Sequence, residues 1–105
     1  MARFLLAAPG PRPAYYKLAE HLWGLRCDFD SDGNSDHPEA TDWTELTITL
    51  RTSEWEQDGK PERVDVDEAE SDGGLVLAIV SENPDLARKA AEYLHREAGG
   101  ELRAG

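Results

Sequence analysis

An uninterrupted apolar run from Leu75 to Val80 predicts a β-strand at the centre of the fold. Because this run leaves no polar face, such a strand needs cover on both sides. Asn83 is a favourable helix N-cap, and Pro84 suits the first helical position. Apolar residues at helical spacing then continue from Leu86 to Ala98, so a packed helix is expected directly after the strand.

The amino-terminal part of the chain predicts another strand and another helix. Phe4 to Ala8 is apolar on both faces, which is typical of an interior strand. Prolines and a glycine between residues 9 and 13 interrupt this run and mark a loop. The next residues place apolar side chains at i, i+3, i+4, i+7 and i+8, which predicts an amphipathic helix from Tyr15 to Trp23.

The middle of the chain predicts two half-buried strands. Residues alternate from Trp43 to Thr52, with Leu46, Ile48 and Leu50 on the apolar face. Arg63 to Asp67 is the expected partner strand, because its two valines fall on one face. Together the two segments predict a hairpin.

Two loop lengths give this hairpin different registers. A two-residue loop pairs Leu50 with Asp67 and puts a carboxylate on the apolar face. A three-residue loop over residues 57–59 pairs Leu50 with Val66 and gives Gly59 the left-handed position of a bulged turn. We predict the three-residue loop, since a slip of one residue would turn every inward side chain outward.

The expected order is therefore β-α-β-β-β-α, with a short final β-strand at residues 101–104, in a single α+β domain over residues 1–105. This order is similar to ferredoxin-like α+β sandwiches with an extra strand in the middle. We predict a two-layer sandwich in which an antiparallel or mixed sheet packs on two helices. The doubly apolar strands need cover on their second face from a flanking helix, from Trp43 and Trp55, or from a partner such as a second copy of the chain.

Size and cysteine content narrow the class of protein. A chain of 105 residues makes one domain with a thin core. Cys27 is the only cysteine, which fits a reducing compartment. The apolar run after Arg3 is too short for a signal peptide, and no segment approaches the ~20 apolar residues of a membrane helix. We therefore expect a cytoplasmic protein with no membrane partner.

Negative charge is concentrated in the middle of the chain. The formal net charge is −11, and residues 28–72 hold sixteen acids against three bases. Direct binding to nucleic acid is disfavoured, because the phosphates would be repelled there. Two interpretations remain: the acids keep the domain soluble, or they form a surface that is complementary to a basic partner.

The string from Asp28 to Glu39 reads D-x-D-x-D-G-x5-E and resembles the calcium loop of the EF-hand family. A hard cation takes about six to eight oxygen ligands, and alternate aspartates around a tight glycine turn supply them. The resemblance implies these calcium ligands: Asp28, Asp30, Asp32, Asn34, Asp36 and Glu39. The alternative is an acidic loop exposed to solvent, since Pro38 obstructs the helix that should follow.

Motifs of catalysis do not stand out. The sequence has no glycine-rich phosphate loop, C-x-x-C, H-E-x-x-H or G-x-S-x-G string. His21, His37 and His95 lie far apart, and Cys27 has no neighbouring signal of an activated thiol. We therefore expect no enzyme, although scattered carboxylates of a hydrolase remain a weaker alternative.

These observations lead to one functional hypothesis and one alternative. The hypothesis is a small acidic, non-enzymatic binding protein, of the inhibitor, immunity or regulatory type, that engages a basic protein partner. Its expected contact residues are Glu45, Asp65 and Asp67, which face outward on the two middle strands if those strands alternate as predicted. The alternative is a domain that binds calcium or another divalent cation through residues 28–39; no other cofactor is expected.

Overall fold

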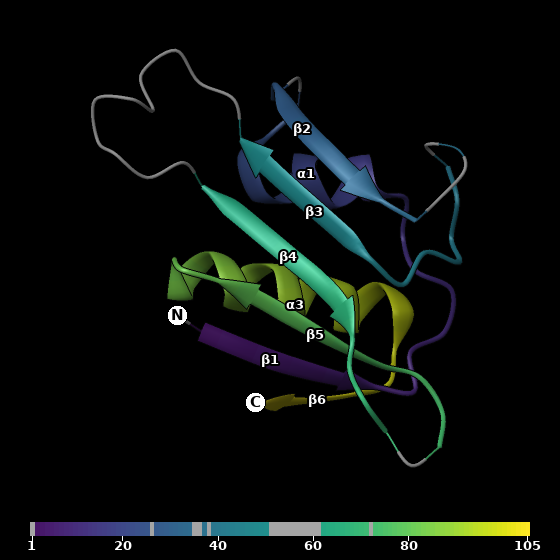
Figure 1. The fold of residues 1–105 in the computed structure, drawn as a ribbon. Coiled ribbons are helices and arrows are strands. Elements are labelled where there is room, and N and C mark those ends of the chain that lie inside the picture. The colour runs from purple at the N-terminus through teal and green to yellow at the C-terminus, as the bar shows by residue number, and fades with distance from the viewer. Residues whose placement is uncertain (1, 26, 35–36, 38, 51–61, 72) are drawn as a thin grey trace.

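The computed structural model describes residues 2–25, 27–34, 37, 39–50, 62–71 and 73–105. Within these residues the chain forms six strands and two helices (Figure 1). The strands are β1 (Ala2–Ala7), β2 (Phe29–Gly33), β3 (Leu46–Leu50), β4 (Arg63–Glu68), β5 (Val76–Ser81) and β6 (Glu101–Ala104). The helices are α1 (Tyr15–Trp23) and α3 (Pro84–Ala98).

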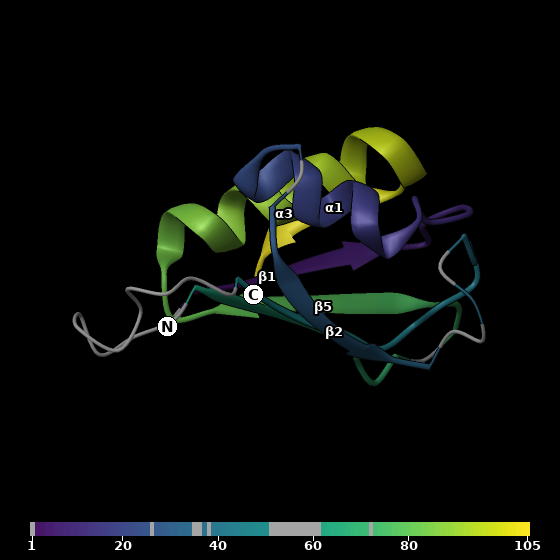
Figure 2. The same ribbon diagram turned by 90° about the horizontal axis from the view of Figure 1, so that it is seen from above.

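The described strands form one antiparallel sheet in the order β2-β3-β4-β5-β1-β6. Both helices lie on the same side of this sheet, as the view from above shows (Figure 2). The fold is therefore an α+β arrangement of two layers, as the sequence predicts. Of the three predicted ways to cover the second face, flanking by one helix on each side does not occur among the described elements.

The apolar run at the centre forms β5, between β4 and β1. Leu77 and Ile79 are fully buried and belong to the core under the helices. Val76 and Ala78 lie on the opposite face, and they also have little exposed surface. Ala78 lies beside Leu5 on one neighbouring strand and Asp67 on the other, and flanking chains shield a small side chain at such a position. The predicted two-sided burial of this strand is confirmed.

The last helix starts and stops where the sequence predicts. The side chain of Asn83 accepts hydrogen bonds from the backbone amides of Asp85 and Leu86, at 3.1 and 3.2 Å. At the other end, Gly99 and Gly100 have φ angles of 78° and 88°, in the left-handed region. A side chain at Gly100 would also collide with the backbone oxygen of Ala7. This tight turn leads directly into β6, the predicted edge strand.

The strand β2 was not predicted, because its residues were interpreted as part of a polar loop. Phe29 is its one apolar side chain, so the segment has no hydrophobic alternation. Its pairing comes from the backbone ladder with β3, which matches Phe29 with Leu50 and Gly33 with Leu46. As an edge strand it has a mostly exposed, polar sequence, and periodicity cannot reveal such a strand.

The predicted register of the β3–β4 hairpin is wrong by four residues. Val66 pairs with Leu46 and Val64 with Ile48, whereas the three-residue loop required Val66 opposite Leu50. The shift is even, so the valines still face the core and the predicted inward faces are correct. Hydrophobic alternation determines only whether a register is odd or even. The turn predicted at residues 57–59 lies outside the described residues.

Trp43 belongs to the helix side of the sheet rather than to the second face. It is almost fully buried in the main core, and its indole Nε1 donates to the Pro13 carbonyl at 2.9 Å. The buried Arg12 also holds this residue in place, because its Nε donates a hydrogen bond to the Trp43 carbonyl at 2.9 Å. The predicted cover by tryptophan therefore fails for Trp43, and Trp55 lies outside the described residues.

Truncation of Leu77 tests the central position of β5. We expect Leu77→Ala to lower the free energy of unfolding by about 2–5 kcal/mol, because it leaves a cavity between sheet and helices. Leu25→Ala is a matched control, since Leu25 is 80% exposed and its truncation should cost less than about 0.5 kcal/mol. Urea denaturation followed by circular dichroism measures both. Equal costs would show that β5 is not central.

Candidate binding surface

The side of the sheet that faces away from both helices is the candidate surface, called here the open face. On each strand its side chains alternate with the buried ones, so they follow from the core positions. Leu6, Ile48, Val66 and Ile79 point into the core. The residues next to them in sequence therefore point to the open face, where no described helix covers them (Figure 2).

The three predicted contact residues come together on this face. Thr47 pairs with Asp65 across β3 and β4, and both alternate with core residues. Glu45 and Asp67 lie one residue beyond the next pair, Leu46 and Val66, so they are cross-strand neighbours on the same face. Asp32 on β2 stands opposite Thr47 and continues the acidic side. Acids from three separate segments of the chain thus lie on one surface.

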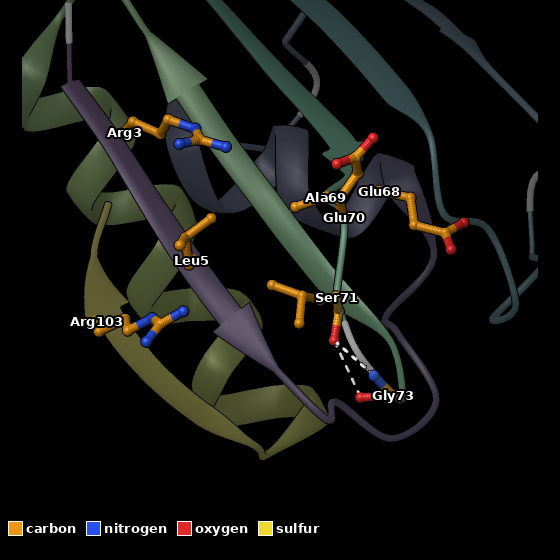
Figure 3. Close-up of a pocket in the computed structure, with 10 residues that line it drawn as sticks. Arg3, Leu5, Glu68, Ala69, Glu70, Ser71, Gly73 and Arg103 are labelled. Carbon is orange, nitrogen blue, oxygen red and sulfur yellow. Dashed lines mark hydrogen bonds between the residues drawn. The ribbon is translucent and has the colours of Figure 1, made fainter.

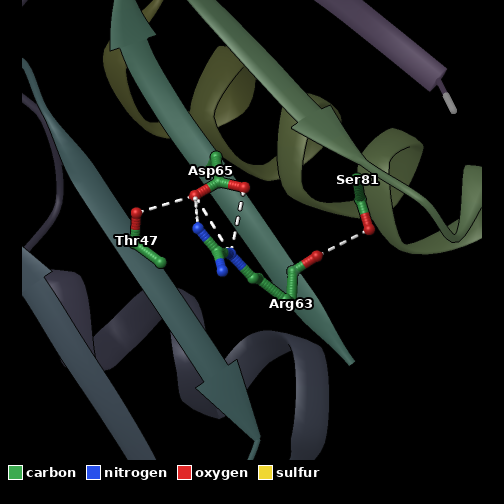
Figure 4. A network of polar contacts seen from close by, with 4 residues as sticks. All are labelled: Thr47, Arg63, Asp65 and Ser81. Carbon is green, nitrogen blue, oxygen red and sulfur yellow. Dashed lines mark hydrogen bonds and ion pairs between the residues drawn. The ribbon is translucent and has the colours of Figure 1, made fainter. Parts of the chain in front are cut away.

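Asp65 differs from the other two, because it is already engaged (Figure 4). Its carboxylate accepts a hydrogen bond from the Thr47 hydroxyl at 2.7 Å and an ion-paired contact from Arg63 Nη2 at 3.0 Å. Hydrogen bonding to Asp65 raises the pKa of the Arg63 guanidinium, and the charge of the carboxylate adds to this. Ser81 links the next strand to this group through a 2.6 Å hydrogen bond to the Arg63 carbonyl.

Asp67 and Glu45 keep their charge available to a partner. Both are exposed, and neither carboxylate has a hydrogen-bond or ion-pair partner among the described residues. Of the three predicted contact residues, these two therefore have carboxylates without a partner in the described part of the chain. Asp65 acts more as a cross-strand link between β3 and β4, in which two opposite charges are already satisfied.

Positive charge occupies the other end of the open face, and sequence reasoning missed it. Arg3 on β1 and Arg103 on β6 are exposed, with Leu5 between them (Figure 3). They line a broad hollow that continues over Val76 to Glu68 and Glu70. Neither guanidinium is hydrogen-bonded or ion-paired to a described residue. The sequence offers no signal for this, because it does not show that β6 pairs with β1.

The predicted calcium ligands are arranged along an extended chain. Asp30 and Asp32 belong to β2, and Asp28 directly precedes it. Residues two apart on a strand are separated by roughly 6.8 Å, whereas calcium needs its oxygens at about 2.3–2.6 Å. An EF-hand loop instead curls around the ion. Glu39 is exposed beyond this strand, and Asp36 lies outside the described residues.

Asn34 has a structural task at the end of β2. Its side-chain oxygen accepts from the backbone amides of Thr44 and Glu45, at 3.0 and 3.1 Å, and its amide nitrogen donates to the Thr44 hydroxyl at 2.8 Å. These contacts close the connection between β2 and β3. They also hold the backbone at Glu45, which positions that carboxylate at the border of the open face.

Two groups with a shifted pKa, Cys27 and His21, lie on the helix side of the sheet. Burial raises the pKa of the Cys27 thiol, and the Glu20 carboxylate raises it further, so the thiol stays protonated at neutral pH. His21 stacks on Tyr93 with ring centroids 4.3 Å apart. Burial lowers the pKa of His21, and the charge of Lys89 adds to this effect. His95 Nε2 lies 3.1 Å from the Gly100 carbonyl, at the helix end.

Comparison with known proteins gives no match: no family model, curated protein or solved structure matches this chain. Among the described residues, no group of three or more His, Cys, Asp or Glu side chains is placed to hold a metal ion. No described helix is long and apolar enough to cross a membrane.

The calcium hypothesis remains a prediction that a melting experiment decides. Because β2 is extended and paired with β3, we expect about 1 mM calcium to leave the melting temperature unchanged within error. Differential scanning fluorimetry with calcium, and with magnesium as a control for ionic strength, measures this. A rise that calcium alone produces, and that Asp32→Asn abolishes, would contradict the expectation and support the EF-hand-like site.

Proposed function

We propose that the protein is a small, non-enzymatic binding module whose open face engages a basic protein partner. The observation that carries this proposal is the convergence of Glu45, Asp65 and Asp67 on a sheet face without a helix over it. Inhibitors, immunity proteins and regulatory modules act in this way, by presenting a surface rather than a reaction centre.

The distribution of charge supports this function over simple solubility. If the acids served solubility alone, no common face would be required of them. Asp32, Glu45 and Asp67 instead share the border between β2, β3 and β4, and Asp67 and Glu45 are unpaired among the described residues. A concentration of negative charge at one end of a face attracts an oppositely charged partner and orients it before contact.

The packing and hydrogen bonds that hold the open face in place also support the proposed binding function. Thr47, Arg63 and Asp65 link β3 to β4 on the open face itself (Figure 4). On the opposite face, Ile48, Val64 and Val66 are packed in the core. Acidic groups on paired strands keep their spacing, so little conformational entropy is lost when a partner binds.

We propose a ferredoxin-like relationship for the fold at the level of topology. The four strands β4-β5-β1-β6 follow the chain as an antiparallel β-α-β-β-α-β unit with both helices on one face. In this interpretation β2 and β3 are an added hairpin at one edge. The relationship implies no function, because this topology carries many unrelated activities.

Charge reversal tests the proposed partner surface. A protein that co-purifies from the native host is needed first, and its binding kinetics are then measured on a surface sensor. We expect Glu45→Lys and Asp67→Lys each to slow association about threefold to tenfold, because long-range attraction mainly sets the on-rate. Raising sodium chloride from about 50 to about 300 mM should slow the wild type in the same way.

Glu92→Lys and Glu97→Lys are the matched controls for this experiment. Both residues are exposed on α3, on the opposite layer, and they change the net charge by the same amount. We expect them to leave the on-rate within about twofold of the wild type. Association that is independent of salt, or equal effects from both sets of variants, would reject the acidic face as the binding surface.

A further inference from the structure

The open face carries charge of both signs, separated by an apolar strip. Across β4, β5, β1 and β6, one row of paired residues reads Asp67, Ala78, Leu5 and Arg103. The order is acid, apolar, apolar, base. If a second copy of this row is placed against the first in the reverse order, each acid meets a base and the apolar residues meet each other. The row is thus complementary to its own reverse.

One neighbouring row keeps this order of charge. Asp65 pairs with Val80, and Val80 pairs with Arg3, so acid, apolar residue and base follow the same direction. The row on the other side differs: Val76 pairs with Ala7 and extends the apolar strip, but Ala7 pairs with Glu101, so this row ends in an acid on β6. Apolar side chains therefore follow the two central strands, interrupted by Arg3 on β1, with acids on β4 along one border and Arg103 beside Glu101 on β6 along the other.

We propose that the open face binds a second copy of this chain, in a symmetric dimer whose two-fold axis runs parallel to the strands between β1 and β5. This axis lays β5 of one copy on β1 of the other and β4 on β6. Leu5 then meets Ala78, and Asp67 meets Arg103, once on each side of the axis. An isologous interface forms every such contact twice.

The alternative two-fold axis, across the strands, lays each strand on its own copy. Asp67 would then face the acidic β4 of the other copy, and like charges in contact are unfavourable. Charge thus selects one of the two face-to-face arrangements. The unpaired state of Arg103 fits the selected one, because its guanidinium group has no ion-pair partner among the described residues.

Area and net charge predict a weak dimer. Four strands at about 4.8 Å and six residues at about 3.4 Å cover a projected area of about 400 Å² per copy. Standard interfaces bury about 800 Å² of accessible surface per partner, so association needs a high protein concentration. Two copies of charge −11 also repel each other, and added salt reduces this repulsion.

The proposed dimer does not depend on the proposed basic partner. The salt dependence of association distinguishes partner binding from self-association. Binding to a basic partner weakens as salt rises, whereas self-association strengthens between about 20 and about 150 mM salt. The dimer also needs Arg103 and Leu5, on which the partner surface does not depend. A basic partner that covers Asp67 would displace the second copy.

A charge swap across the interface tests the dimer by analytical ultracentrifugation. The protein is measured from about 10 µM to about 1 mM in about 0.15 M sodium chloride. We expect Asp67→Arg and Arg103→Asp each to weaken association about tenfold, because the symmetric dimer loses the contact twice. The association constant of the double variant should return to within about threefold of the wild-type value. Within one chain these residues are three strands apart, roughly 14 Å, so their coupling there is small.

Arg88→Asp, Glu92→Arg and their double variant are the matched controls, with the same changes of net charge on exposed positions of α3. We expect them to leave the association constant within about twofold. Circular dichroism confirms that each variant is folded. A protein that stays monomeric to about 1 mM, a dimer that ignores Asp67 and Arg103, or a double variant without recovery would each overturn the proposed interface.

Discussion

The sheet of this protein is covered by helices on one side only, and the other features follow from that asymmetry. The central strand β5 is apolar on both faces, so its second face has to be protected without a helix. Neighbouring strands provide this protection for the small Ala78, which lies between Leu5 and Asp67. Val76 on the same face is also buried, whereas Leu5 and Val80 stay partly exposed.

A second feature of the open face is the unequal distribution of charge across its strands. Strands toward β2 carry acids, whereas β1 and β6 carry Arg3 and Arg103 together with Glu101, so the net charge of −11 does not describe how charge is distributed on this surface. Where opposite charges meet within the chain, as at Asp65 and Arg63, they stabilise the hairpin. Where they do not meet, as at Asp67 and Arg103, the charges have no partner among the described residues.

The elements with their own periodicity or caps could be predicted from the sequence. Asn83, Pro84 and Gly99 mark the ends of α3, and the apolar run at Leu75 marks β5. The edge strand β2 could not be predicted, because backbone pairing forms it and side-chain burial contributes little. The hairpin register was predicted only in its parity, since alternating valines and leucines fit any even shift.

Only the acidic half of the candidate surface could be predicted. Glu45, Asp65 and Asp67 lie on predicted strands with clear alternation, so their common outward face follows from the pattern. Arg3 and Arg103 are 100 positions apart in the sequence, and only the pairing of β6 with β1 brings them to one face. Long-range pairing between strands is set by the packing of the whole chain, which local patterns do not contain.

The most direct measurement of the central claim compares thiol accessibility on the two faces of the sheet. Single cysteines are placed at Ile48, Thr49, Ile79 and Val80 in a Cys27→Ser background, and a maleimide reagent is added to dilute protein. Thr49→Cys and Val80→Cys should react at least about tenfold faster than Ile48→Cys and Ile79→Cys, which are exposed only when the protein opens. Equal reaction rates for the two cysteines of each neighbouring pair, 48 and 49 or 79 and 80, would contradict an open face.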